Sequence, residues 1–119
     1  MKLFDWLPFG RVSEISPEAL KEQLESVQLV DVRTLGEFQK SHIQGAVNIP
    51  ITHFSKKAIS ELSLDQSIPV VTICLSAHRS IPATRQLKQL GYDVKQLQGG
   101  MVAWWNRSYP VVSGQAENG

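Results

Sequence analysis

The chain has only one cysteine, Cys74, and no long apolar run. A lone cysteine excludes a framework of internal disulfides and suits a reducing compartment, so we expect a cytoplasmic protein. No stretch of the sequence approaches the ~20 apolar residues needed to span a bilayer, so we expect no transmembrane segment.

The sequence also lacks an excess of charge of either sign. It carries 12 basic and 11 acidic residues, for a net charge of +1. This balance gives no electrostatic reason to expect nucleic acid as a partner. His53 and Cys74 lack the spacing typical of a metal site, and nothing else in the sequence calls for a metal or another cofactor.

A length of 119 residues suits one domain, and 42% hydrophobic residues suit a globular core. We divide the chain into an apolar N-terminal segment (1–10), a folded domain (11–112) and a polar C-terminal tail (113–119). The N-terminal segment lacks a small-residue cleavage site, so it is not expected to be a signal peptide. We expect it to fold back onto the domain, with docking to a partner as the alternative.

Strand-like apolar runs alternate with helical patterns along the domain. Strands are predicted at 11–15, 28–32, 45–50, 70–73 and 94–97, with helices at 16–26, from 34 onward, at 54–62, at 80–90 and from 99 onward. Ser16 is expected to cap the first helix, and Thr34 with Glu37 forms a capping box for the second. Such alternation predicts an α/β fold, with a mostly parallel central sheet of about five strands and helices on both faces.

Cys74 lies where the strand at 70–73 ends and the next helix approaches. In parallel sheets the active crevice lies at the carboxyl ends of the strands. Loop N–H groups and the positive end of the helix favour a thiolate there, so Cys74 is a candidate nucleophile. A tight loop can also turn its N–H groups inward to hold an anion. After Cys74 the loop consists of Leu75, Ser76, Ala77, His78 and Arg79, of which His78 and Arg79 add side-chain donors.

Four polar residues are candidates for a supporting role: Asp31, Arg33, Glu37 and Ser80. Arg33 and Glu37 are four residues apart across a helix start, which favours an ion pair that fixes the loop. Asp31 is near the end of its strand, within possible reach of the Cys74 loop, and Ser80 begins the following helix. We expect the first three, together with His42, to be mainly structural.

Three separated stretches of this chain resemble the single-domain rhodanese (sulfurtransferase) family, over roughly residues 15–110. They are Leu29–Arg33 with Glu37-Phe38 and His42–Pro50, then Cys74–Ser80, then Leu97–Gly100 with Ala103-Trp104. The resemblance implies a three-layer rhodanese-like fold in which Cys74 takes a sulfane sulfur from a donor such as thiosulfate. Cys74 would hold this sulfur as a persulfide and pass it to cyanide, a thiol or a partner sulfur-carrier protein. The resemblance also implies that residues 75–79 cradle the sulfur and that Arg79 attracts the anionic donor.

The chain departs from the family pattern at Ala77, where many active members carry glycine. If that position needs a positive φ, alanine costs about 1 kcal/mol of strain. The departure leaves a non-catalytic rhodanese-like binding or regulatory module as an alternative. A phosphatase is a weaker one, because cell-division-cycle phosphatases, which resemble rhodaneses in fold, place five residues between cysteine and arginine. Cys74 and Arg79 have four between them.

Overall fold

A five-stranded, wholly parallel sheet forms the centre of the computed structural model, which describes residues 12–114. The expected segment 1–10 and residues 115–119 of the expected tail lie outside the described residues. The strand order is β1-β5-β4-β2-β3. The strands are β1 (Glu14–Ile15), β2 (Gln28–Asp31), β3 (Val47–Asn48), β4 (Val70–Ile73) and β5 (Val94–Leu97). The predicted fold class is therefore confirmed, and β4 lies at the middle of the sheet.

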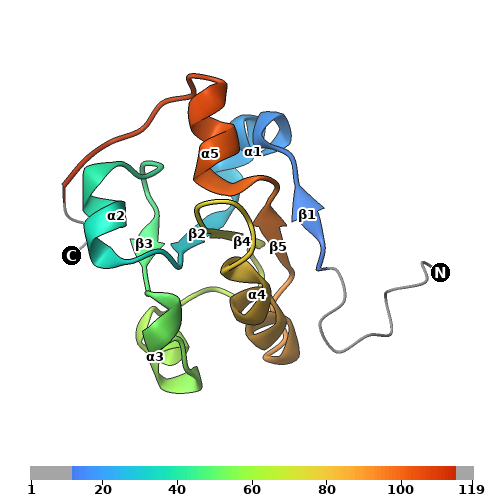
Figure 1. The fold of residues 1–119 in the computed structure, drawn as a ribbon. Coiled ribbons are helices and arrows are strands. Elements are labelled where there is room, and N and C mark those ends of the chain that lie inside the picture. Colours follow the sequence, from blue (N-terminus) through green and yellow to red (C-terminus); the bar gives the residue numbers. More distant parts are fainter. Residues whose placement is uncertain (1–11, 115–119) are drawn as a thin grey trace.

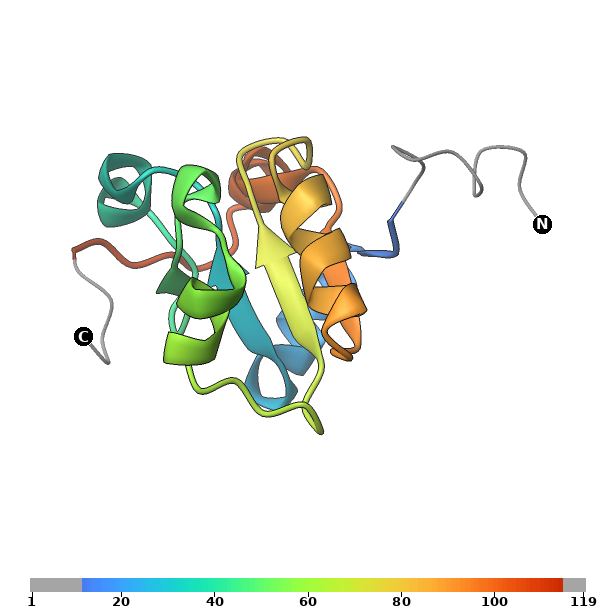
Figure 2. The same cartoon turned by 90° about the horizontal axis from the view of Figure 1, so that it is seen from below.

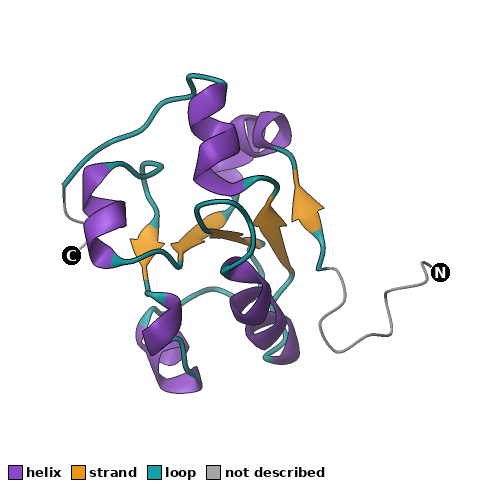
Figure 3. Ribbon diagram, in the orientation of Figure 1, coloured by secondary structure: helices purple, strands orange, loops and turns teal. Residues whose placement is uncertain are grey.

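Helices cover both faces of this sheet (Figure 1). They are α1 (Pro17–Gln23), α2 (Leu35–Lys40), α3 (Lys56–Glu61), α4 (Ser80–Gln89) and α5 (Gly100–Asn106), with short 3-10 turns η1 (Leu24–Ser26) and η2 (Ile51–His53). In Figure 1, α1 and α5 lie above the sheet and α3 and α4 below it. Figure 2 views the molecule from the α3 and α4 side, and Figure 3 shows the loops that join the strand ends to the helices.

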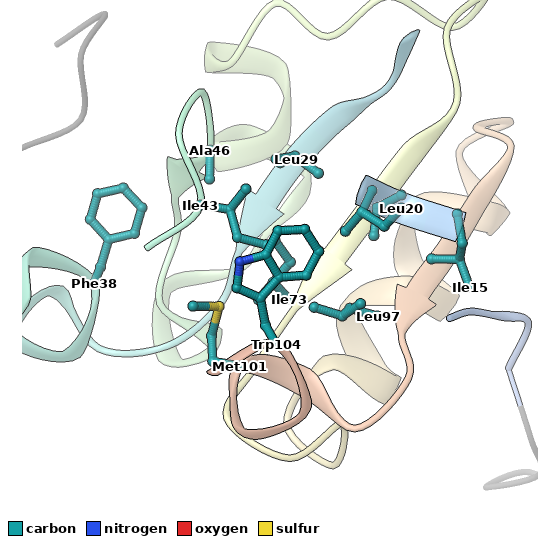
Figure 4. Close-up of a cluster of buried hydrophobic side chains, with 11 residues drawn as sticks. Ile15, Leu20, Leu29, Phe38, Ile43, Ala46, Ile73, Leu97, Met101 and Trp104 are labelled. Atoms are coloured by element: carbon teal, nitrogen blue, oxygen red, sulfur yellow. The ribbon is translucent and has the colours of Figure 1, made fainter. Parts of the chain in front are cut away.

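Two apolar cores lie on the two faces of the sheet. The first joins α1, α2 and α5 to the strands and contains Leu20, Phe38, Met101 and Trp104 (Figure 4). The second joins α3 and α4 to the strands and contains Ile59 and Leu87, among others. β4 contributes to both cores, because successive side chains of a strand point to opposite faces. All four of its residues are buried, so the position that follows β4 is firmly fixed.

The helix signals of the sequence act as expected. The Ser16 side chain accepts a hydrogen bond from the Ala19 N–H, and Thr34 and Glu37 form the complete capping box. The strand predicted at 45–50 is present but too long, because regular pairing covers only Val47–Asn48. Gly45 has a φ of +88°, outside the strand conformation, and Pro50 leads directly into η2. Within residues 12–114, no helix has the length and apolar character needed to cross a bilayer.

Candidate active site

Cys74 is the first residue after β4, at the carboxyl end of the central strand. Only 1% of its surface is exposed, and it packs within the core shared with α3 and α4. The six-residue connection from Cys74 to Arg79 leads into α4, which begins at Ser80 as the sequence predicts. The structure therefore confirms the strand-end position on which the candidate nucleophile was based.

The start of α5 holds the backbone of the Cys74 loop. The Met101 N–H donates to the Cys74 carbonyl at 2.8 Å, and the Val102 N–H donates to the Leu75 carbonyl at 3.0 Å. A Cβ on Gly100 would collide with the Cys74 carbonyl oxygen and would lie 2.6 Å from the Leu75 carbonyl. Only glycine permits this approach, a role that the sequence reasoning missed because it predicted only a helix from residue 99 onward. A paired glycine at a predicted helix start was the available signal.

Ala77 adopts a left-handed backbone with a φ of +74° inside the loop. It is 8% exposed, whereas its neighbours Ser76 and His78 are exposed. The condition on which strain was expected is therefore met, since an L-residue with a side chain is disfavoured at this φ. Reversal of the backbone at such a residue is one way to turn successive N–H groups toward a common centre.

Arg79 ends the loop in an ion pair with Glu37 of α2. Its two terminal nitrogens lie 2.7 and 2.9 Å from the two carboxylate oxygens. Hydrogen bonding to Arg79 lowers the pKa of Glu37 to about 2, with a further contribution from Thr34. The pKa of Arg79 is raised in turn, first by Glu37 and to a lesser extent by attraction to Cys74 and Asp31, while desolvation opposes the shift. Both side chains therefore stay charged over the ordinary pH range.

The expected side-chain ion pair between Arg33 and Glu37 is wrong. Arg33 instead pairs with Asp31 at 2.8 Å, with both side chains almost fully buried. It also donates to the backbone carbonyls of Ser41 at 2.6 Å and Glu37 at 3.4 Å. The Arg33 side chain thus binds backbone groups at the C-terminal end of α2, whereas the Glu37 carboxylate binds Arg79 at the end of the cysteine loop. Asp31 was considered as a possible contact of the Cys74 loop, but its carboxylate accepts hydrogen bonds from the backbone and side chain of Arg33.

Ser80 brings a hydroxyl to the cysteine sulfur. Its Oγ lies 3.5 Å from the Cys74 Sγ and 2.6 Å from the Gln96 Oε1. The Gln96 Nε2 in turn donates to the Glu14 carboxylate at 3.0 Å. Gln96 and Glu14 were not predicted as site residues, because each was assigned only to a strand. The signal available was weak: a polar side chain within the final strand of the sheet.

His42 supports the other core rather than the cysteine loop. It is 1% exposed and stacks on Phe38, with 3.8 Å between ring centroids. Its Nδ1 lies 2.7 Å from the Phe38 carbonyl oxygen, which fixes that nitrogen as the donor. This placement fits the structural role expected for His42. No group of three or more potential metal ligands occurs within the described part of the chain.

Comparison with known proteins identifies the family. A family model described as a rhodanese-like domain matches residues 16–107. A sulfurtransferase of Allochromatium vinosum is 38% identical over 106 residues, which cover 86% of this chain and 96% of that protein.

Solved structures agree with the sequence comparison. A rhodanese-related protein of Thermoplasma volcanium has a TM-score of 0.77 at 30% identity, over 85% of this chain and 98% of that chain. A thiosulfate sulfurtransferase of Pseudomonas aeruginosa has a TM-score of 0.78 at 26% identity, over 87% of this chain but 20% of that chain.

Proposed function

This chain belongs to the rhodanese-like domain family, and from that premise we propose that Cys74 carries sulfur from a donor to an acceptor as a persulfide. The observation that carries the proposal is the position of the thiol. It lies at the carboxyl end of the central strand, at the start of a six-residue loop that leads to Arg79 and α4. A relative that the chain covers almost end to end is named a sulfurtransferase, which supports the same reaction class.

The proposed reaction has two half-reactions, and thiosulfate is the proposed donor. The Cys74 thiolate attacks the outer sulfur of thiosulfate, a new S–S bond forms, and the old one breaks to release sulfite with its electron pair. An acceptor such as cyanide then attacks the outer sulfur of the persulfide. The electron pair of that S–S bond returns to Cys74, and thiocyanate leaves. The two steps balance without an external oxidant or reductant, and they predict ping-pong kinetics.

The loop supplies the proposed environment for the sulfur. Backbone N–H groups of Leu75, Ser76, Ala77 and His78 are proposed to surround it, and the positive φ of Ala77 supports such a cradle. Arg79 is proposed to attract an anionic donor. A guanidinium has five N–H donors, and the two hydrogen bonds to Glu37 leave others for a ligand. We further propose that the reaction takes place in the reducing cytoplasm, as a lone cysteine suggests.

A non-catalytic binding module is the second candidate, and the strained Ala77 is the observation that favours it. A module of that kind needs no reactive thiol, whereas this chain keeps its only cysteine at the strand end. A phosphatase is less well supported, because the four residues between Cys74 and Arg79 make a smaller loop than the five of the related phosphatases.

Intact-mass spectrometry tests the proposal directly. After incubation with thiosulfate, the protein should gain the mass of one sulfur atom, and cyanide should remove it. Cys74→Ser is the matched control, because it changes one atom of the only cysteine and should gain nothing. Absence of an adduct with thiosulfate and with other sulfane donors would reject the catalytic proposal and leave the binding module. Release of phosphate from an aryl phosphate would instead support the phosphatase.

A further inference from the structure

A chain of four side chains links the buried thiol to the edge of the sheet. Cys74, Ser80 and Gln96 are 1%, 0% and 4% exposed, whereas Glu14 on edge strand β1 is exposed. The links measure 3.5 Å from Cys74 to Ser80, 2.6 Å from Ser80 to Gln96 and 3.0 Å from Gln96 to Glu14. The reactive sulfur is therefore connected by hydrogen bonds to a carboxylate at the surface.

The direction of each hydrogen bond in this chain follows from what each group is able to donate. The Glu14 carboxylate oxygen is the acceptor at the surface end, so the Gln96 amide presents its NH₂ to Glu14 and its carbonyl oxygen to Ser80. That carbonyl also only accepts, so the single proton of the Ser80 hydroxyl goes to Gln96. Lone pairs of the Ser80 oxygen then face the sulfur. Such an oxygen accepts a hydrogen bond from a thiol and gives none to a thiolate.

We propose that Gln96 and Glu14 are positioning residues that hold the Ser80 proton away from the Cys74 sulfur. With the Ser80 proton turned away, the hydroxyl gives no hydrogen bond to the Cys74 thiolate, and this restrains thiolate formation. Stabilisation of the thiolate is left to the loop and Arg79. The consequence for sulfur transfer rests on the function proposed above. A less stabilised thiolate is a stronger nucleophile toward the donor but a slower leaving group when the acceptor attacks the persulfide.

Other charged groups near the thiol act independently of the hydrogen-bonded series from Cys74 to Glu14. Arg79 is attracted to Cys74 and to Asp31, and its guanidinium is bound to Glu37. Asp31 is paired with Arg33 at the end of β2, and His78 is exposed within the loop. None of these groups is among the hydrogen-bond partners of Ser80 or Gln96, so substitutions of Ser80, Gln96 or Glu14 leave them in place.

The pH profile of Cys74 alkylation by iodoacetamide tests the proposal without any sulfur transfer. Because Cys74 is the only cysteine, the alkylation rate belongs to this thiol alone, and the midpoint of its pH profile reports thiolate formation. Gln96→Met keeps the length of the side chain but removes the acceptor for Ser80. Ser80 then turns its proton to the sulfur, and the midpoint of the pH profile should fall by about one pH unit. Below the midpoint, the variant then has roughly tenfold more thiolate than the wild type. Gln98→Met, an exposed site two residues along, is the matched control and should leave the midpoint unchanged.

Ser80→Ala shows whether the Ser80 hydroxyl is the group that moves. In the Gln96→Met background it should raise the midpoint back toward the wild-type value, whereas alone it should not raise it. An equal rise in both backgrounds would mean that Ser80 always donates to the sulfur, which overturns the proposal. No shift in folded Gln96→Met would also overturn it.

Glu14 offers a second pair of variants at the surface, where loss of folding is least expected. Glu14→Gln and Glu14→Met remove the same charge, but only glutamine keeps an oxygen that accepts from Gln96. The midpoint should fall with methionine and stay higher with glutamine. Equal shifts would show that charge alone acts and would overturn the positioning role. A midpoint that responds as described in a protein that forms no persulfide would reject the proposed function and leave this inference standing.

Discussion

The guanidinium of Arg79 and the carboxylate of Glu37 form a two-point ion pair that ties the cysteine loop to α2. The two N–O distances are 2.7 and 2.9 Å, and about a third of each side chain is exposed. The cation proposed to attract an anionic donor is thus already balanced by a carboxylate. Substitutions on the two sides of the pair should change donor binding in opposite directions.

Arg79→Ala should weaken the use of an anionic donor. Loss of the guanidinium removes the attraction for thiosulfate and leaves the Glu37 carboxylate to repel it. We expect the KM for thiosulfate to rise about tenfold or more, from a loss of at least 1.4 kcal/mol of binding free energy. Steady-state kinetics checks this, and an unchanged KM would remove Arg79 from donor binding.

Glu37→Gln should have the opposite effect on the same constant. Glutamine still completes the capping box with Thr34, but it no longer neutralises Arg79. The KM for thiosulfate should fall roughly two- to fivefold, as expected for about 0.5–1 kcal/mol of exposed electrostatic free energy. Glu18→Gln is the matched control, because it breaks the exposed Glu18–Arg107 pair and should leave KM unchanged. A rise in KM with Glu37→Gln would show that the pair orients Arg79 for the donor.

The same pair predicts a pH-dependent contribution to stability. The pKa of Glu37 is lowered from 4.5 to about 2 in the folded protein, so the unfolded chain takes up its proton first as the pH falls. The pair therefore stabilises the fold fully above about pH 4.5 and loses this contribution as the pH approaches 2. Because the pair is partly exposed, its contribution is about 1 kcal/mol. Urea unfolding of wild type and Glu37→Gln should differ by that amount near neutral pH and converge in acid. A constant difference would contradict this.

The Arg79–Glu37 pair also shows what the sequence was able to predict. Local patterns placed Cys74 at a strand end, the Thr34–Glu37 capping box at a helix start and Ser80 at the next one, because each depends on neighbouring residues. The choice of ionic partners depends on which elements meet in space, and Glu37 finds its partner 42 positions away. Spacing along the chain therefore favoured Arg33, which is the wrong partner.

The contacts of Gln96 and Gly100 show the same limit. Gln96 meets Ser80 only because β5 pairs with β4, which places it beside the start of α4. Gly100 meets the Cys74 loop only because α5 begins against the end of β4. The parallel fold was predictable from alternating patterns, but the register and approach that create these contacts were not.

Ala77→Gly should leave stability nearly unchanged, although Ala77 is buried. The substitution relieves about 1–2 kcal/mol of left-handed strain. Against this, loss of the buried methyl group destabilises the fold by about 0.8 kcal/mol. The greater conformational freedom of glycine in the unfolded chain destabilises it by about a further 0.4–1 kcal/mol. Ala83→Gly, at a buried position inside α4, has no strain to relieve and should cost about 1.3–1.8 kcal/mol. Equal losses of unfolding free energy in the two variants would show that Ala77 is unstrained.

Gly100→Ala should disrupt sulfur transfer more than the addition of a single methyl group suggests. The added Cβ would collide with the backbone of Cys74 and Leu75, at a φ of +58° that already disfavours alanine. The loop or the start of α5 must then move, which stretches the hydrogen bonds from Met101 and Val102.

Gly45→Ala is the matched control, because its φ is +88° but nothing lies within 4 Å of the added atom. Urea unfolding should show a loss of about 1–2 kcal/mol from strain in the control and a larger loss in Gly100→Ala. Persulfide formation per folded molecule should fall only in Gly100→Ala, since only that variant displaces the cysteine backbone. Full persulfide formation there would show that the loop tolerates movement of α5, and that the approach of Gly100 serves stability alone.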